Sequence, residues 1–229
     1  MALTSRKAKQ TMKKKKIMTI ALALSVVSII AAGGSLAYFT DKDQKENVFI
    51  MGNVDIELEE QFQQDSKLIP GGENMNLVEK MVDVKNAGSE DAYVRVHIGV
   101  PKAADPCIHL VKGKAPDSIS YPWVWSDETY DVTYENKDYT VHMATYQRRM
   151  AEEGKTVIPA IEAVYMDSAV TNTTISELKD YGAVADGKLD IKVMAEGVQA
   201  EGFGDAESAF AAAFGEISET NNPFTGYSK

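Results

Sequence analysis

A strictly alternating run over residues 92–100 constrains the fold more than any other part of the chain. One face carries apolar side chains at every second position, and the other carries Tyr93, Arg95 and His97; the apolar set is Ala92, Val94, Val96, Ile98 and Val100. A period of two is typical of a half-buried β-strand. We therefore expect a strand whose aliphatic face lies in the core and whose other face, including His97, is exposed.

Other segments show the same alternation between turn signals. The predicted strands are 54–58, 77–85, 119–126, a hairpin of 130–134 and 139–143 around a turn at 135–138, 155–165 with an edge or bulge at Pro159, and 189–195. No alternation of strands with long helices is visible. About eight short strands of this kind predict an all-β, mainly antiparallel sandwich.

Two segments instead favour short peripheral helices. Apolar residues follow a helical period after Asp205, a suitable N-cap, and Gly215 stands just past the last of them; the set is Ala206, Ala209, Phe210, Ala213 and Phe214. Residues 174–181 predict one or two helical turns. Both helices are too short to form a layer of their own.

The N-terminus carries the three parts of a secretory signal peptide. Four lysines at 13–16 precede an apolar run over 17–32, and Ser35-Leu36-Ala37 forms a small-x-small cleavage site. We expect cleavage between Ala37 and Tyr38; a retained membrane anchor is the alternative. The predicted organisation is a leader at 1–37, an N-terminal segment at 38–52, a sandwich domain at 53–218 and a flexible tail at 219–229.

Charge excludes some classes of partner. The chain has 24 Lys and Arg against 34 Asp and Glu, and all seven basic residues before Tyr38 belong to the predicted leader. The processed chain then has 17 basic and 34 acidic residues, a net charge near −17. Such a chain lacks the basic surface that nucleic acids and anionic membranes require, so we expect membrane contact only through an uncleaved leader.

Motifs for catalysis or tight metal binding are not apparent in the sequence. The chain has three histidines and one cysteine, and only His109 lies near Cys107; His97 and His142 fall on predicted strands. A single thiol permits no internal disulfide, although it permits a cross-link between two subunits. We predict no catalytic residues, no metal site and no cofactor. Surface acids such as Asp41, Asp43 and Asp65 suit weak Ca²⁺ screening rather than a dedicated site.

Two further motifs have a functional and a structural interpretation. Asn222-Pro223-Phe224-Thr225-Gly226 is similar to a sortase signal but lacks the apolar span and basic tail of such substrates. Trp123 and Trp125 are candidate glycan-binding aromatics, yet core packing is the commoner role. We favour the structural interpretation of both.

Three separated segments resemble one known family. They are Ala37–Leu58, with Ala-Tyr-Phe-Thr-Asp, Asn-Val-Phe and Gly-Asn-Val-Asp-Ile-Glu-Leu; Ile69–Val100, with Val-Asp-Val-Lys-Asn-Ala-Gly-Ser-Glu-Asp-Ala-Tyr-Val-Arg-Val; and Val198–Gly215. All three are similar to the TasA/camelysin family of exported bacterial proteins. The resemblance implies a jelly-roll-like sandwich and a leader cut by a signal peptidase of the SipW type.

The resemblance also implies a way of assembling. In the fibre-forming members, a subunit donates its N-terminal strand to the sheet of a neighbour, a case of β-augmentation. The corresponding donor here is residues 38–52, with anchors at Tyr38, Phe39, Val48, Phe49 and Ile50. The alternative is that residues Val48 to Leu58 pair within their own domain and leave a monomer with a flexible start.

These observations together predict a secreted structural protein of the extracellular matrix or cell surface. It would be a biofilm fibre subunit or accessory, with further copies of itself and other matrix proteins as partners. Camelysin-type members carry a metallopeptidase label, so a secreted metallopeptidase is the first alternative. A cell-surface adhesive or glycan-binding module is the second.

Overall fold

A computed structural model of the chain describes residues 40–44, 47–48, 54–62, 66–73, 75–181, 184–185 and 188–227. In chain order the elements are β1 (Thr40–Gln44), β2 (Asn47–Val48), β3 (Ile56–Phe62), β4 (Val78–Asn86), β5 (Ala92–Pro101), the 3-10 helix η1 (Asp105–Cys107), β6 (Ile108–Lys112), β7 (Trp123–Trp125), β8 (Tyr130–Tyr134), β9 (Lys137–Tyr146), β10 (Ile161–Met166), α2 (Asn172–Asp180), β11 (Val184–Ala185), β12 (Lys188–Leu189), β13 (Lys192–Gln199) and α3 (Ala206–Phe214). In these ranges no helix is long and apolar enough to cross a membrane.

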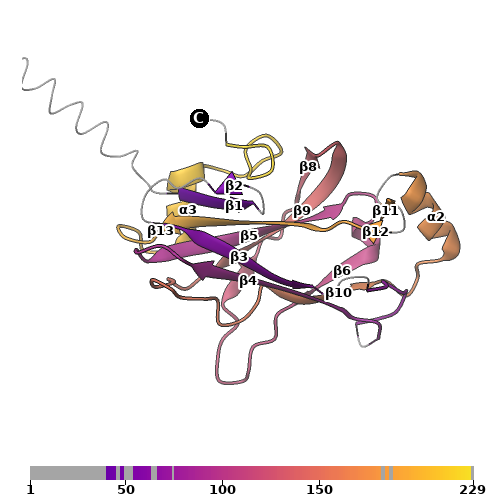
Figure 1. The fold of residues 1–229 in the computed structure, drawn as a ribbon, viewed down its shortest axis with the longest axis horizontal. Coiled ribbons are helices and arrows are strands. Elements are labelled where there is room, and N and C mark those ends of the chain that lie inside the picture. Colours follow the sequence, from indigo (N-terminus) through magenta and orange to yellow (C-terminus); the bar gives the residue numbers. More distant parts are fainter. Residues whose placement is uncertain are drawn as a thin grey trace, which may run out of the picture. The chain divides into compact units, whose positions relative to one another are not determined.

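The strands form two main antiparallel sheets (Figure 1). The larger sheet has seven strands in the order β2-β1-β13-β5-β9-β7, with β8 also paired to β9; the smaller has four, in the order β3-β4-β10-β6. A separate two-stranded ribbon joins β11 to β12. The predicted fold class, an all-β and mainly antiparallel sandwich with short helices, is confirmed.

The core lies between the two sheets. Its largest cluster combines buried residues of β4, β5, β9, β10 and β13, including Val82, Val84, Val94, Val96, Ile98, Ala144, Val164 and Ala195. The predicted aliphatic face of 92–100 is thus confirmed as the core face. Removing these methyl-rich side chains from water is the main stabilising term for such a sandwich.

The opposite face of β5 differs from the prediction. Tyr93, Arg95 and His97 are buried rather than exposed, and His97 is completely so. The cover comes from the C-terminal part of the chain, because Tyr93 and Val198 pack in one cluster with Phe210 and Phe214 of α3. The larger sheet is therefore buried on both faces near β5 and β13.

Strands β13 and β3 approach each other closely at Gly197. A Cβ atom placed there would lie 2.6 Å from Ile56 Cγ2 and 3.1 Å from Val54 Cγ1. A Cβ contact of 2.6 Å is essentially never found, so a side chain at this position would force Ile56 or the neighbouring backbone to shift. Glycine lets β13 lie directly against the edge of the smaller sheet.

Both predicted helices form. Helix α3 has Asp205 as its N-cap, which accepts a hydrogen bond from the Ser208 amide at 2.8 Å, and Gly215 at its end has φ 71°. Helix α2 begins at a capping box in which Thr171 and Thr174 satisfy each other's backbone amides. The local signals alone were sufficient for these two elements.

The turn between β8 and β9 contains two residues, Glu135 and Asn136, because Tyr134 pairs with Lys137. Both have positive φ, 51° and 62°. A two-residue hairpin loop of this kind matches the right-handed twist of its strands. Glu135 also forms an ion pair of 3.0 Å with Lys192.

The strand predicted at 155–165 is shorter in the structure and covers only Ile161–Met166. Pro159 has no N–H to give to a ladder, so the preceding residues contact β4 through separate bonds instead. The Thr156 and Ala160 amides donate to Val84 and Val82 carbonyls at 2.9 and 2.8 Å.

Candidate functional site

The predicted processing and donor residues fall mostly outside the described residues. Ala37, Tyr38, Phe39, Phe49 and Ile50 all lie there, as does the whole predicted leader, residues 1–37. Val48 is described as the end of β2, by its backbone. The cleavage site and the anchor side chains therefore stay predictions.

The backbone of residues 40–44, just after the predicted cleavage site, has a defined place in the larger sheet. Strand β1 pairs antiparallel with β13, in the register Thr40 with Val198, Asp41 with Gly197, Lys42 with Glu196 and Asp43 with Ala195. Strand β2 then folds back on β1. We call the edge of β13 that β1 fills, residues 195–198, the strand slot.

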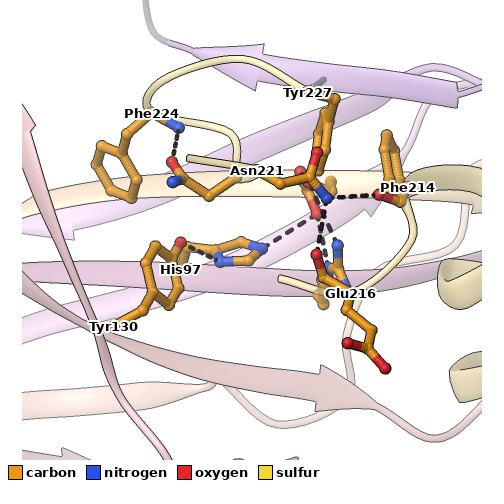
Figure 2. A network of polar contacts seen from close by, with 10 residues as sticks. His97, Tyr130, Phe214, Glu216, Asn221, Phe224 and Tyr227 are labelled. Carbon is orange, nitrogen blue, oxygen red and sulfur yellow. Dashed lines mark hydrogen bonds and ion pairs between the residues drawn. The ribbon is translucent and has the colours of Figure 1, made fainter. Parts of the chain in front are cut away.

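The side chain of Glu196, within the strand slot, belongs to a buried ionic network. Figure 2 shows this network from close by. Glu196 is completely buried, and its Oε2 accepts hydrogen bonds from Arg95 Nε at 2.6 Å and from His97 Nε2 at 3.1 Å. Its Oε1 accepts a hydrogen bond from the Tyr227 hydroxyl. Both carboxylate oxygens thus have donors despite the absence of solvent.

Electrostatics keeps Glu196 ionised. Burial by itself raises the pKa of its carboxyl group, but the electrostatic effects of Arg95 and then His97, together with their hydrogen bonds, outweigh burial and lower the pKa to about 2. A fully buried carboxylate without such partners would strongly destabilise the folded protein. Arg95 is in turn covered by an aromatic ring, because its guanidinium carbon lies 4.3 Å from the Phe210 ring centroid.

Tyr130 closes the network on the β8 side. Its hydroxyl lies 2.8 Å from His97 Nδ1. Burial, followed by the nearby negative charge of Glu196, raises the pKa of the Tyr130 hydroxyl. The His97 ring therefore lies between two oxygens, with Nε2 facing Glu196 and Nδ1 facing Tyr130.

The C-terminal segment 215–227 lies over the network and is not a frayed tail. Tyr227 stacks on Phe214 with ring centroids 4.3 Å apart, and Asn221 donates to the Phe214 and Glu216 carbonyls at 2.9 and 2.7 Å (Figure 2). The Phe224 ring packs near Tyr134. The prediction of a flexible tail at 219–229 missed this order, since aromatic anchors spaced through a Gly- and Asn-rich segment show no period.

The sortase-like motif has a structural role in this segment. Asn222 is completely buried, and its side-chain amide donates to the Ser218 and Glu219 carbonyls at 2.8 and 2.9 Å. Its carbonyl oxygen accepts from the Phe224 and Thr225 amides. The motif is therefore a closed turn that satisfies its own polar groups.

The histidines do not converge on a metal site. Each one contacts a different carboxylate: His97 contacts Glu196, His109 contacts Asp167 at 3.1 Å, and His142 contacts Asp105 at 2.6 Å. Within the described ranges, no group of three or more His, Cys, Asp or Glu side chains is placed to hold a metal ion. Catalytic zinc needs three protein ligands and an open position, so the residues present do not fit it.

Cys107 and the tryptophans also have structural surroundings. Cys107 is half-buried, and burial, followed by the charge of Asp167, raises the pKa of its thiol. Trp123 is buried and donates from Nε1 to the Ile158 carbonyl at 2.8 Å, which confirms core packing for it. Trp125 is half-buried and donates to the Tyr121 hydroxyl.

Sequence comparison gives one match. Residues 11–98 match the family model described as camelysin metallo-endopeptidase. This stretch of the chain is a camelysin-family segment. The predicted resemblance to the TasA/camelysin family is thereby confirmed over residues 11–98. No curated protein and no solved structure matches the chain.

The camelysin-family segment ends at Ile98, so the strand slot lies beyond it. Strand β1 belongs to the matched segment, whereas β13 and the C-terminal segment do not. Sequence reasoning missed Glu196 and Tyr227 as partners of His97. One signal was present: Glu196 stands between Met194 and Val198 on the same face of a strand, which is typical of an acid that is covered rather than solvated.

Proposed function

We propose that this chain is a secreted structural protein that assembles into extracellular matrix fibres by passing its N-terminal strand to a neighbouring copy. The camelysin-family segment supports export, and a signal peptidase of the SipW type would release the strand at Tyr38. Assembly by this route needs no cofactor, and Ca²⁺ would act through screening of surface acids.

The observation that carries the proposal is the position of β1. It lies directly after the predicted cleavage site and pairs with one side of β13. The pairing is made through the backbone, so β1 of a second copy fits the same slot in the same register. A head-to-tail contact of this kind does not close on itself and therefore propagates into a filament.

The link between β1 and β3 sets the balance between the closed and the exchanged form. Only residues 45–55 separate the two strands, so β1 of the same chain has a high effective concentration at its own slot. Exchange requires β1 to leave first. We therefore expect a slow, nucleated conversion from closed monomers to filaments.

Deletion of residues 38–46 tests the proposal. We expect a processed chain that begins at Tyr38 to form filaments by negative-stain electron microscopy, and the deletion variant to form none, because the slot has no donor. A Lys42→Thr variant, which keeps the backbone and suits a strand, should still form filaments. Unchanged filaments in the deletion variant would contradict strand donation by this segment.

The description of the matched family model favours a second function, a secreted metallopeptidase. Hydrolysis of azocasein by the purified processed chain, abolished by EDTA and restored by Zn²⁺, would support it. Because the histidines contact three separate carboxylates, we expect no such hydrolysis.

A further inference from the structure

We propose that the C-terminal segment 215–227 is a clamp on the outer face of β13 that controls how firmly the strand slot holds β1. The proposal deepens the proposed function, since it assigns regulation of the slot to the opposite end of the chain. The clamp affects assembly only through strand donation. The coupling between the clamp and the strand slot acts within one molecule and needs no second copy.

The clamp and the slot share the same residues of β13. Glu196 pairs through its backbone with Lys42 of β1, and its side chain accepts the Tyr227 hydroxyl. Two positions along, Val198 pairs with Thr40 and packs in the same cluster as Phe210 and Phe214. The N-terminal strand therefore pairs with the backbone of the same short stretch, residues 196–198, whose side chains contact Tyr227 at Glu196 and α3 at Val198.

The clamp is built to hold its position. Tyr227 is fixed by its hydrogen bond to Glu196 and by stacking on Phe214. Asn221 fastens the segment to the end of α3, and the closed turn at Asn222 carries Phe224 into a cluster with Met194 of β13. The clamp thus contacts β13 at residues 194 and 196, alternate positions of its outer face, and α3 covers the next such position, Val198.

Loss of the clamp would free this face of the strand. Without the Tyr227 hydroxyl, Glu196 loses the donor to Oε1, and a buried carboxylate in that state favours water entry or movement of β13. The backbone of residues 196–198 would then fluctuate more, and its pairing with β1 would open more often. Strands β4 and β10 of the smaller sheet, whose buried residues in the described ranges belong to a different cluster from Tyr227 and Phe224, should be unaffected.

Hydrogen exchange of the processed monomer tests the coupling. In a Tyr227→Phe variant, which keeps the ring and its stacking, we expect exchange of the amides at 40–44 to become about tenfold faster, the size of one hydrogen bond to a charged group. Truncation before Tyr227 should have a larger effect. A Tyr181→Phe variant is the matched control, because Tyr181 is largely exposed and distant in sequence.

Unchanged exchange at 40–44 in both the Tyr227→Phe and the truncated chain would overturn the clamp. Faster exchange at 40–44 with unchanged exchange in β4 and β10 would support it. Because the readout is taken on monomers, it separates the two proposals. Coupling without filaments would refute strand donation alone, and filaments without coupling would refute the clamp alone.

Discussion

The Glu196→Gln variant should lose about 3–5 kcal/mol of unfolding free energy at pH 7. Glutamine has nearly the same shape, but it removes the negative charge that compensates Arg95, whose side chain is almost fully buried. An uncompensated buried guanidinium is the main cause of the loss. Urea denaturation monitored by tryptophan fluorescence would measure it.

Two variants make the Glu196 experiment specific. A double variant, Arg95→Met with Glu196→Leu, removes both charges and should recover much of the stability, because desolvation of the pair disappears with it. Lys102→Met breaks an exposed pair with Asp131 and should cost less than about 1 kcal/mol. Equal losses for the buried and the exposed pair would contradict the role given to Glu196.

Acid should remove the stabilisation that Glu196 supplies. Its pKa in the folded protein is about 2, below its ordinary value of 4.5, so the folded state favours the ionised group. The resulting stability is fully present above pH 4.5 and is lost as pH falls toward 2. This difference between the two pKa values of Glu196 corresponds to about 3 kcal/mol of unfolding free energy.

The Glu196→Gln variant serves as the reference for this pH dependence. Between pH 5 and 2 the wild-type unfolding free energy should fall by about 3 kcal/mol more than that of the variant. Asp131→Asn, which alters an exposed carboxyl group whose pKa is lowered mainly by Lys102, should retain the steep wild-type fall. Parallel curves for wild type and Glu196→Gln would show that Glu196 is not the group responsible.

The sequence predicts the local parts of the fold well. The alternation at 92–100 identifies β5 and its core face, and the N-cap at Asp205 with Gly215 identifies α3. These signals work because side-chain period and cap chemistry depend on neighbours within one turn or one strand. They are independent of what the rest of the chain does.

What the sequence does not reveal depends on contacts between distant segments. The solvent-facing assignment of His97 was wrong because its partners, Tyr130 and Glu196, lie 33 and 99 residues later in the chain. Tyr227 is joined to Glu196 across 31 residues without any shared pattern. The apolar neighbours of Glu196, namely Met194 and Val198, were a clue to a covered face, but they do not name the partner.

The backbone of residues 40–44 pairs with β13 of the same chain. For a donor strand this is the expected state of a monomer, since the same hydrogen bonds serve within one copy or between two. The donor anchors at Tyr38, Phe39, Val48, Phe49 and Ile50 stay predictions. The closed monomer and the strand-exchanged filament differ in which copy supplies β1 to the strand slot.

Disulfide trapping between copies measures that distinction directly. In a Cys107→Ser background, chains carrying Thr40→Cys are mixed with chains carrying Val198→Cys, two positions that are direct partners in the β1–β13 ladder. Such partners lie within the range of a disulfide. A mixture with Ser89→Cys in place of Thr40→Cys is the control, because Ser89 is exposed and lies outside the slot.

Strand donation predicts that the first mixture forms disulfide-linked pairs under conditions that give filaments, and that the control mixture does not. A chain carrying both Thr40→Cys and Val198→Cys, oxidised as a monomer, should be locked closed and form no filaments. Filaments that grow without any cross-link between copies, or from the locked monomer, would contradict the assembly by strand exchange.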